Sequence, residues 1–303
     1  MGDRLIRQEF ELVSVGLPVY NGGKSIERAL FSLLNQTYKN IEIIISDNGS
    51  SDTTQDICTK FAFKASNIKY YRYEDNMGAR WNFSNVLNLS SGKFFMFAAH
   101  DDYWDETYIR SCYKQLNNNP NLVLCFTGAI RTFIDQGNKQ VFTSEEAIIS
   151  KSTDSSFHRF FRYISHQNTA IPIYGLMRKD VFNMIDHSSV YLGIDRGWLA
   201  QLAILGEFGY VPEPLIFLER QEKTPLDYYK IIGKKHGSII LPKLEEMFGI
   251  IKSVWTLKSI PLWSKPIYSI LCFVGYFTKY RKRISKEIKQ FLTKHVFNDF
   301  FEN

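Results

Sequence analysis

The first 126 residues alternate between short apolar runs and amphipathic segments, and this alternation restricts the fold more than any other feature. Continuous β-branched runs such as Ile41–Ser46 are typical of parallel strands buried on both faces. The first intervening segment places Ile26, Leu30 and Leu33 at helical spacing. Strands that alternate with helices in this way predict an α/β fold, a mostly parallel sheet flanked by helices. We expect strands at residues 12–19, 41–46, 68–74, 94–98 and 122–126.

The pattern changes after the fifth apolar run. Residues 130–170 mix polar loops with one aromatic segment. Beyond them we expect short elements at residues 174–177, 179–185, 195–205 and 214–218. The sequence therefore predicts one α/β domain over residues 1–225, made of the parts 1–127 and 128–225, and a basic, amphipathic helical region over residues 226–303.

The net charge of +6, from 37 Lys and Arg against 31 Asp and Glu, is concentrated at the C-terminal end. Residues 252–303 hold ten basic and three acidic side chains, a net charge of +7, so residues 1–251 carry −1. A protein that coats nucleic acid needs cations along its whole binding face. The near-neutral body argues against a nucleic-acid partner.

Composition narrows the class of protein further. A content of 45% hydrophobic and 22% charged residues supports a full core and excludes a disordered or collagen-like chain. The four cysteines are scattered without a CxxC pair, which favours buried free thiols in a reducing compartment. We find no long apolar segment near the N-terminus and no run of about 20 apolar residues, so we expect a cytoplasmic protein.

Polar residues follow the predicted strands at one edge of the sheet. In open parallel sheets, ligands bind beyond the carboxyl ends of the strands. These positions, strand by strand, are Pro18, Tyr20 and Asn21, then Asp47, then Asp75, Asn76 and Gly78, and then His100, Asp101 and Asp102. Acidic residues after three different strands are hard to explain by packing, so we expect a ligand site at this edge.

The adjacent acids Asp101 and Asp102 carry the sharpest signal. Two carboxylates in sequence repel each other unless a cation lies beside them, and oxygen ligands suit Mg²⁺ or Mn²⁺ together with a substrate phosphate. The alternative is a solvated acidic turn or the N-cap of a helix that starts near Trp104. For Asp47 the alternative is turn chemistry in the Asp-Asn-Gly-Ser sequence. The position of both sites after buried strands favours ligand binding.

Residues 13–54 (VSVGLPVYNGG…IEIIISDNGSSDTT) resemble the opening of the family 2 nucleotide-sugar glycosyltransferases, which have the GT-A fold. Residues 75–104 (DNMGARWNFSNVLNLSSGKFFMFAAHDDYW) resemble the same family's Asn-x-Gly helix and metal-binding segment. The similarity is dense over residues 12–126 and patchy to about residue 220. It implies that residues 1–127 bind the nucleotide, and that residues 128–225 hold the acceptor and the general base.

The resemblance also implies roles for single residues. Pro18, Tyr20 and Asp47 would hold the nucleobase and ribose, Asn21 would belong to the same nucleotide-sugar site, and Asn76 and Arg80 would line the nucleotide pocket. Asp101 matches the second, metal-binding acid of the family's Asp-x-Asp motif, where it would also meet the nucleotide sugar, and Asp102 is the acid beside it. Ala99 replaces the first acid of that motif.

The family places its general base at the start of a later helix. The matching segment, residues 192–220 (LGIDRGWLAQL…IFLER), nominates Asp195, with Ile194 where the family often has Glu. The alternative for Asp195 is a helix N-cap. The family's later Arg-x-His appears here as Arg220-Gln221-Glu222, so Arg220 is the candidate for a phosphate contact, with His166 as a substitute for the missing histidine.

The apolar part of the tail, Pro266–Phe277, is too short to span a bilayer. Aromatic and aliphatic residues beside a Lys/Arg cluster suit a helix that lies in a membrane interface. The alternative is a helical cap packed on the domain. We expect contact through residues 255–295 with the inner face of the cytoplasmic membrane.

Together these features predict a metal-dependent, inverting glycosyltransferase that uses Mn²⁺ or Mg²⁺. It would move one sugar from a nucleotide-diphosphate donor to a hydroxyl of a saccharide or lipid-linked saccharide, in bacterial cell-surface polysaccharide assembly. The Gln-x-x-Arg-Trp signature of processive synthases is absent, which favours a single transfer. One alternative is a catalytically degenerate protein that binds nucleotide sugars. Another, nucleotidyl transfer, would favour a Gly-rich, basic loop after the first strand, where only Lys24 is found.

Overall fold

The computed structural model describes residues 11–133, 138–142, 149, 155–166, 169–187, 191, 193–220 and 241–292. A single mixed sheet forms the centre of the molecule, in the strand order β3-β2-β1-β4-β8-β6-β9-β5, with β7 paired to β6. The strands are β1 (Val13–Val19), β2 (Ile41–Asn48), β3 (Ile68–Tyr73), β4 (Phe94–Phe97), β5 (Asp102–Trp104), β6 (Leu122–Phe133), β7 (Asn138–Phe142), β8 (Leu176–Arg178) and β9 (Glu207–Arg220).

The four neighbouring strands β3, β2, β1 and β4 are parallel, and so are β6 and β9. Every antiparallel pairing among the described strands involves β5, β7 or β8. The predicted α/β fold is therefore confirmed, with a parallel half formed by the first 97 residues and a mixed half beyond it. Because β1 and β2 run side by side with Val19 opposite Asp47, their carboxyl ends meet at one edge.

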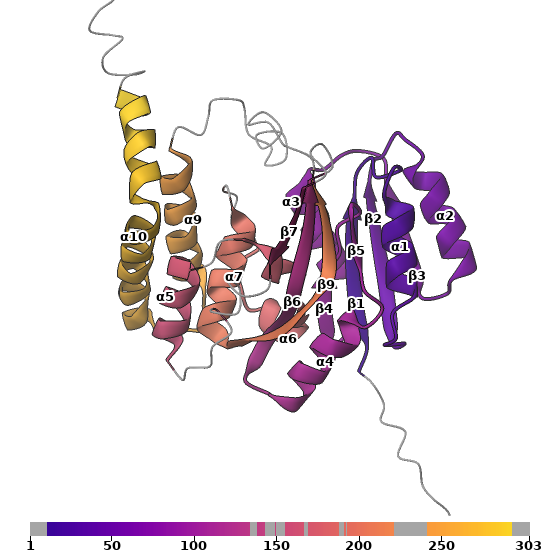
Figure 1. The fold of residues 1–303 in the computed structure, drawn as a ribbon, viewed down its shortest axis with the longest axis horizontal. Coiled ribbons are helices and arrows are strands. Elements are labelled where there is room, and N and C mark those ends of the chain that lie inside the picture. Colours follow the sequence, from indigo (N-terminus) through magenta and orange to yellow (C-terminus); the bar gives the residue numbers. More distant parts are fainter. Residues whose placement is uncertain are drawn as a thin grey trace, which may run out of the picture.

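Helices cover the sheet and form an extra layer at one end (Figure 1). They are α1 (Ile26–Leu34), α2 (Thr54–Lys64), α3 (Ala79–Leu89), α4 (Tyr108–Asn118), α5 (Ser156–His166), α6 (Lys179–Phe182), α7 (Ile194–Leu205), α9 (Pro242–Thr256) and α10 (Lys265–Leu292), with the 3₁₀ helices η2 (Ile171–Tyr174) and η3 (Leu262–Ser264). α3 packs on β1 and β2, and α4 packs on β6 and β9. α5, α7, α9 and α10 pack against one another, so the described part of the predicted C-terminal region, residues 241–292, is mainly helical, as predicted. Residues 226–240 and 293–303 of that prediction lie outside the described residues.

Two strands are longer than their sequence patterns indicate. The predicted strand at 122–126 continues to Phe133, and the one at 214–218 begins at Glu207. The second half of β6 contains Gly128, Arg131 and Thr132 and is partly exposed after Ala129, so it lacks the continuous apolar run of a buried strand. These residues are strand because β6 pairs with β9 over its whole length, a non-local interaction that overrides local propensity.

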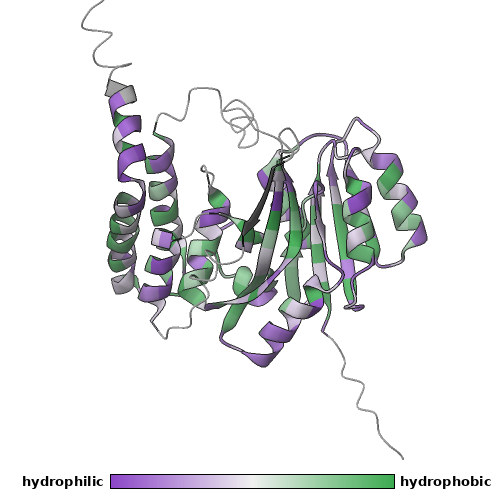
Figure 2. Ribbon diagram, in the orientation of Figure 1, coloured by the Kyte–Doolittle hydropathy of each residue, from purple (hydrophilic) through white to green (hydrophobic). Residues whose placement is uncertain are grey.

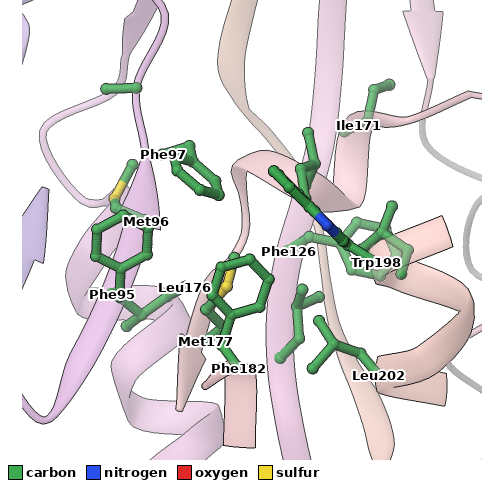
Figure 3. Close-up of a cluster of buried hydrophobic side chains, with 14 of the residues drawn as sticks. Phe95, Met96, Phe97, Phe126, Ile171, Leu176, Met177, Phe182, Trp198 and Leu202 are labelled. Atoms are coloured by element: carbon green, nitrogen blue, oxygen red, sulfur yellow. The ribbon is translucent and has the colours of Figure 1, made fainter. Parts of the chain in front are cut away.

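A cluster of buried aromatic and sulfur-containing side chains joins β4 and β8 to α6 and α7 (Figure 3). The ring of Phe97, on β4, stacks on Trp198 of α7 with centroids 6.0 Å apart, and Phe182 meets Trp198 edge-on at 5.9 Å. Asp101 follows Phe97 by four residues, and Asp195 precedes Trp198 by three. The core thus fixes the helix that starts with Asp195 against the strand that leads to Asp101.

All four cysteines are buried and free, as the sequence predicted. Across the helices that the structure describes, none is both long and apolar enough to cross a membrane.

Candidate active site

The end of β1 and the loop after β2 are hydrogen-bonded to each other at the predicted ligand edge. Asn21 adopts a left-handed backbone conformation (φ 53°), its N–H donates to Ser50 Oγ at 2.9 Å, and its Oδ1 accepts the N–H of Ser51 at 2.9 Å. Tyr20 is 46% exposed beside these bonds. Pro18 is buried within β1, beyond the last residue that pairs with β4, so its missing N–H interrupts no bond to that strand.

Asp47 lies at the carboxyl end of β2 with its side chain fully buried. Its Oδ1 accepts the N–H of Ser50 at 2.9 Å, its Oδ2 accepts the hydroxyl of Tyr70 at 2.8 Å, and Arg72 Nε lies 3.8 Å from Oδ2. Burial and the bond to Asp47 both raise the pKa of Tyr70, so the phenol stays a donor. These contacts hold the carboxylate in one orientation; its contact with a nucleobase stays a prediction.

Asn48 connects β2 to the loop before α3. In the sequence it is part of the Asp-Asn-Gly-Ser turn and is not predicted as a site residue. It is 1% exposed. Its Nδ2 donates to Asn76 Oδ1 at 2.8 Å, and its Oδ1 accepts the N–H of Met77 at 2.9 Å. Gly78 has φ +87°, a conformation that glycine adopts without strain, and Arg80 is exposed in the first turn of α3. The predicted residue Asn76 is thus tied to the end of β2, and Arg80 follows it at the start of α3.

The two adjacent acids after β4 have different surroundings. The residue Asp101 is partly exposed. Asp102 is fully buried at the start of β5, and its Oδ1 accepts the N–H of Glu219 at 3.3 Å. Glu219 is on β9, which pairs with β5. The structure therefore separates the pair into one acid that solvent reaches and one that ties β5 to β9.

Arg28 of α1 reaches the same segment, although nothing in its local sequence marks it. Its Nη1 pairs with Glu219 Oε1 at 2.5 Å, its Nη2 donates to the carbonyl of Asp101 at 3.2 Å, and its guanidinium lies 4.5 Å above the ring of Tyr103. The hydrogen bond from Arg28 to Glu219 raises the pKa of the guanidinium, which stays charged. No motif marks Arg28; the one available signal is a charged residue at a half-buried position of α1, next to the apolar side of the helix.

Asp195 is in the first turn of α7, after Gly193, whose φ of +78° suits glycine. Its carboxyl is surrounded by protein and only partly reached by solvent. Burial raises the pKa of Asp195 above its ordinary value, the cation of Arg196 opposes this, and the anion of Glu246 adds to it. A carboxylate with a raised pKa is better suited to accept a proton than an ordinary aspartate.

The last two candidates from the sequence are Arg220 and His166. Arg220 is the last residue of β9, opposite Phe133 in the strand register, while Gln221 and Glu222 lie outside the described residues. His166 is exposed at the end of α5, and its Nδ1 contacts Ser165 Oγ at 2.8 Å. No described contact joins His166 to the other predicted site residues.

Within the described part of the chain, no three His, Cys, Asp or Glu side chains gather as a metal cage. Mg²⁺ and related ions usually keep several waters and use only one or two carboxylates together with substrate phosphates. The exposure of Asp101 fits such a shared site, whereas the burial of Asp102 fits it poorly.

Comparison with known proteins adds the family. The model of glycosyl transferase family 2 matches residues 14–185, more than half of the chain. Glycosyltransferase GlyG of Streptococcus pneumoniae is 26% identical over 59% of this chain and 60% of its own length. The Escherichia coli protein WfaP, named a UDP-Glc:alpha-D-GlcNAc-diphosphoundecaprenol beta-1,3-glucosyltransferase, is 40% identical over 33% of this chain and 39% of its own. The chain thus spans less than two thirds of the length of each of these two curated relatives.

Solved structures have the same fold. S. aureus TarS (residues 1–349) in complex with UDP-GlcNAc aligns with a TM-score of 0.63 and 14% identity, covering 93% of this chain and 81% of that one. The mannosyltransferase PcManGT of Pyrobaculum calidifontis, in complex with GDP-Man and Mn²⁺, aligns with a TM-score of 0.51 and 11% identity, covering 95% and 80%. The fold, the aligned sequences and the family match agree with the resemblance of residues 13–54 and 75–104, and the chain belongs to glycosyl transferase family 2.

Proposed function

We propose that this protein is an inverting glycosyltransferase that moves one sugar from a nucleotide-diphosphate donor to a hydroxyl of an acceptor saccharide. The observation that carries the proposal is the stacking of Phe97 on Trp198, because it couples the strand before Asp101 to the helix that begins at Asp195. Asp101 would bind the donor through the metal, and Asp195 would act on the acceptor hydroxyl. The complex of TarS with UDP-GlcNAc, on the same fold, supports a nucleotide-sugar donor.

The nucleotide would bind at the carboxyl ends of β1, β2 and β3. Asp47, oriented by Ser50 and Tyr70, would accept an N–H of the nucleobase. Tyr20 offers an exposed ring beside it for the base or ribose. The other members of this proposed nucleotide-sugar site are Pro18, Asn21, Asn76, Arg80, Asp101 and Arg220.

Asp101 would hold Mn²⁺ or Mg²⁺ together with the donor diphosphate. PcManGT in complex with GDP-Man and Mn²⁺ supports a metal on this fold. When bound, the metal would neutralise charge on the departing diphosphate. The sequence also predicts Asp102 as a ligand, but its burial and its bond to Glu219 favour a role in holding β5 on β9. Arg28 would fix the backbone of Asp101 through its carbonyl.

Asp195 would act as the general base. Its carboxylate takes the proton of the acceptor hydroxyl, and the hydroxyl oxygen forms a bond to the anomeric carbon while the bond from that carbon to the diphosphate oxygen breaks. Attack on the side opposite to the leaving group inverts the configuration. A raised pKa makes the Asp195 carboxylate a stronger base for this proton transfer.

The acceptor would be a lipid-linked saccharide in bacterial cell-surface polysaccharide assembly. WfaP, by its name, acts on a diphosphoundecaprenol-linked sugar, and it is 40% identical over 33% of this chain. Such an acceptor is held in a membrane, so the enzyme needs a surface that approaches lipid.

The outer face of the C-terminal helices has the composition of a membrane-contacting surface. Figure 2 shows that hydrophobic residues of α10 gather in its N-terminal half and hydrophilic residues toward its C-terminal end. Buried Tyr268 and Cys272 define the inner face of α10. The exposed apolar surface consists of Phe248, Trp255, Leu262, Trp263, Ile267, Ile270, Phe273 and Val274.

Exposed cations are found in the same helical region: Lys252 and Lys258 lie among these residues in the sequence, and Arg281 and Lys282 follow them on α10. Aromatic and aliphatic side chains beside Lys and Arg favour an interface with anionic lipid, at about 1 kcal/mol per cation near the bilayer. We propose that the protein acts as a peripheral protein at the inner face of the cytoplasmic membrane.

The test is a panel of UDP-, GDP- and dTDP-sugars scored by nucleotide release with Mn²⁺, with Mg²⁺ and with chelator. We expect metal-dependent release with one donor class, and losses of about 10²-fold or more in Asp101→Asn and Asp195→Asn. Glu106→Gln, an exposed acid near the same segment, is the matched control. A nucleotide that raises the melting temperature without any turnover would instead identify a degenerate binding protein, and an active Asp101→Asn would overturn the site.

A further inference from the structure

Helix α7, which has Asp195 in its first turn, is joined to both α9 and α10 by a cluster of buried charges. Arg196 Nη1 lies 3.0 Å from Glu246 Oε1 on α9 and donates to the hydroxyl of Tyr280 on α10 at 3.0 Å. The second oxygen of Glu246 pairs with Lys243 Nζ at 2.5 Å, and Lys243 lies 4.5 Å above the ring of Tyr280. Glu246 is only 2% exposed, so solvent screens these interactions weakly.

Charges alternate in sign through the cluster. Lys243 also donates its backbone N–H to Glu287 of α10 at 3.1 Å, and Glu287 pairs with Arg283 at 3.4 Å. Burying one such charge without its partner costs several kcal/mol, so the members hold one another in place. The residues Gly193 and Glu246 are also in close proximity, which brings α9 directly against the turn before Asp195.

The titratable and charged groups around this turn come from every helix packed on it. They are Arg196 on α7, Lys243 and Glu246 on α9, Tyr276 and Tyr280 on α10, Tyr163 on α5, and Asp186 and Tyr191 in the preceding segment. Burial, followed by negative neighbours, raises the pKa of Tyr191 and Tyr276, so both phenols stay neutral. Arg196 and Glu246 are the charges that act on Asp195 with opposite sign.

We propose that Arg196 is a positioning residue: through Glu246 and Tyr280 it fixes the first turn of α7 and sets the electrostatic environment of Asp195. The guanidinium is adjacent to the general base in sequence but is held by the C-terminal helices, so α9 and α10 are part of the catalytic scaffold. This inference rests on the proposed role of Asp195 as the general base.

The test compares the pH dependence of kcat/KM in variants of the full-length protein. Nucleotide release from UDP-glucose or UDP-GlcNAc, whichever is turned over, gives the rate. Arg196→Gln removes a cation beside Asp195, which should raise the pKa of Asp195. The acidic limb of the profile of kcat/KM against pH should therefore move to higher pH. Glu246→Gln removes an anion, so the limb should move to lower pH. Opposite shifts are the signature, because purely structural damage lowers the rate without moving the limb in two directions.

Further variants keep the outcome decisive. Arg196→Lys keeps the charge and should restore the position of the limb, and the double variant Arg196→Gln/Glu246→Gln should bring it back between the single variants. Lys286→Gln, which removes an exposed cation of α10 outside the cluster, should leave the limb unchanged. Shifts of the same sign, or no shift, in Arg196→Gln and Glu246→Gln would overturn the proposal.

The base assignment is tested separately. Full activity in Asp195→Asn would reject Asp195 as the general base. If Asp195→Asn is inactive and the acidic limb stays in place in the other variants, only the positioning role of Arg196 is rejected. If Arg196→Gln does not fold, as judged by its melting curve, the other two variants decide the question. The proposal then requires that Glu246→Gln moves the acidic limb to lower pH and that Arg196→Lys leaves it in place.

Discussion

Arg28 and Glu219 are 191 residues apart in the chain, yet Arg28 Nη1 and Glu219 Oε1 lie 2.5 Å from each other. The pair joins α1, near the start of the fold, to the end of β9. Between them passes the segment Asp101–Tyr103, held by the guanidinium through the Asp101 carbonyl and the Tyr103 ring. The position of the proposed metal ligand therefore depends on an ion pair between elements from opposite ends of the domain.

Replacing Arg28 with Met should weaken function more than stability. Both partners are partly exposed, so loss of the pair should lower the free energy of unfolding by about 1 kcal/mol or less. The freed Asp101 segment should raise the donor KM and the metal concentration for half-maximal activity several-fold. Lys93→Met, which removes the exposed pair between Lys93 and Glu11, is the control, and an unchanged donor KM and metal requirement in Arg28→Met would contradict the prediction.

Glu42 should govern part of the acid sensitivity of the fold. Burial alone would raise its pKa, but hydrogen bonds from Lys69, Ser14 and Ser91 outweigh it and lower the pKa from 4.5 to about 2. A depressed carboxyl pKa stabilises the fold fully above the ordinary value and loses this contribution as the pH falls toward 2. Glu42→Gln should therefore melt at lower temperature at pH 6 and show a flatter melting curve against pH below 4.5.

The exposed Glu27 of α1 offers a matched control for that measurement. Glu27→Gln should keep the wild-type dependence of melting temperature on pH. If Glu42→Gln keeps it as well, the buried contacts of Glu42 do not stabilise the charged form.

Asp47→Asn should lower both stability and nucleotide affinity. The new amide keeps one acceptor oxygen, so its NH2 group would face one of the two groups that now donate to Asp47, either the Ser50 backbone or the Tyr70 hydroxyl. An unsatisfied buried donor costs about 1–3 kcal/mol, measurable by chemical denaturation. Asp56→Asn, on the exposed face of α2, should change the free energy of unfolding by no more than about 0.5 kcal/mol. Equal stability of the two variants would show that the bonds to Asp47 contribute nothing.

The proposed membrane-contacting surface of α9 and α10 predicts the result of a vesicle flotation experiment. The full-length protein should co-float with vesicles that contain phosphatidylglycerol, less at 0.5 M salt, because exposed cations are screened. Trp263→Gln with Ile270→Gln should reduce the floated fraction, since both side chains are exposed and apolar. Phe63→Gln, an exposed apolar residue on α2, should float like the native protein. Equal flotation of the tail variant and the native protein would reject the membrane surface.

The parallel half of the fold could be read from the sequence because its information is local. Ile43, Ile44 and Ile45 are all fully buried, so a continuous run marks a strand wherever it occurs. The start of α7 at Ile194 was predicted to within one residue, since its apolar pattern is also local. The same reasoning located Asp47 and Asp101 at strand ends.

What the sequence did not reveal depends on distant contacts. Half-exposed strand residues such as Arg131 are in a strand only because β9 lies beside them. Arg28 and Glu246 acquire their importance from partners in other helices and strands, and nothing in the residues next to them indicates those partners. The tail illustrates both cases, because its amphipathic pattern predicts helix, whereas its packing on α5 and α7 is visible only in three dimensions.

The ion pair between Arg196 and Glu246 has a practical consequence for anyone who shortens or recombines this protein. A version that ends before Pro242, designed to remove the positively charged tail and improve solubility, would leave Arg196 without its carboxylate and uncover the inner surface of α7. Exchanging the last two helices with those of a relative would preserve the arrangement only if residues 196 and 246 were exchanged together. The tail cannot be treated as a detachable anchor.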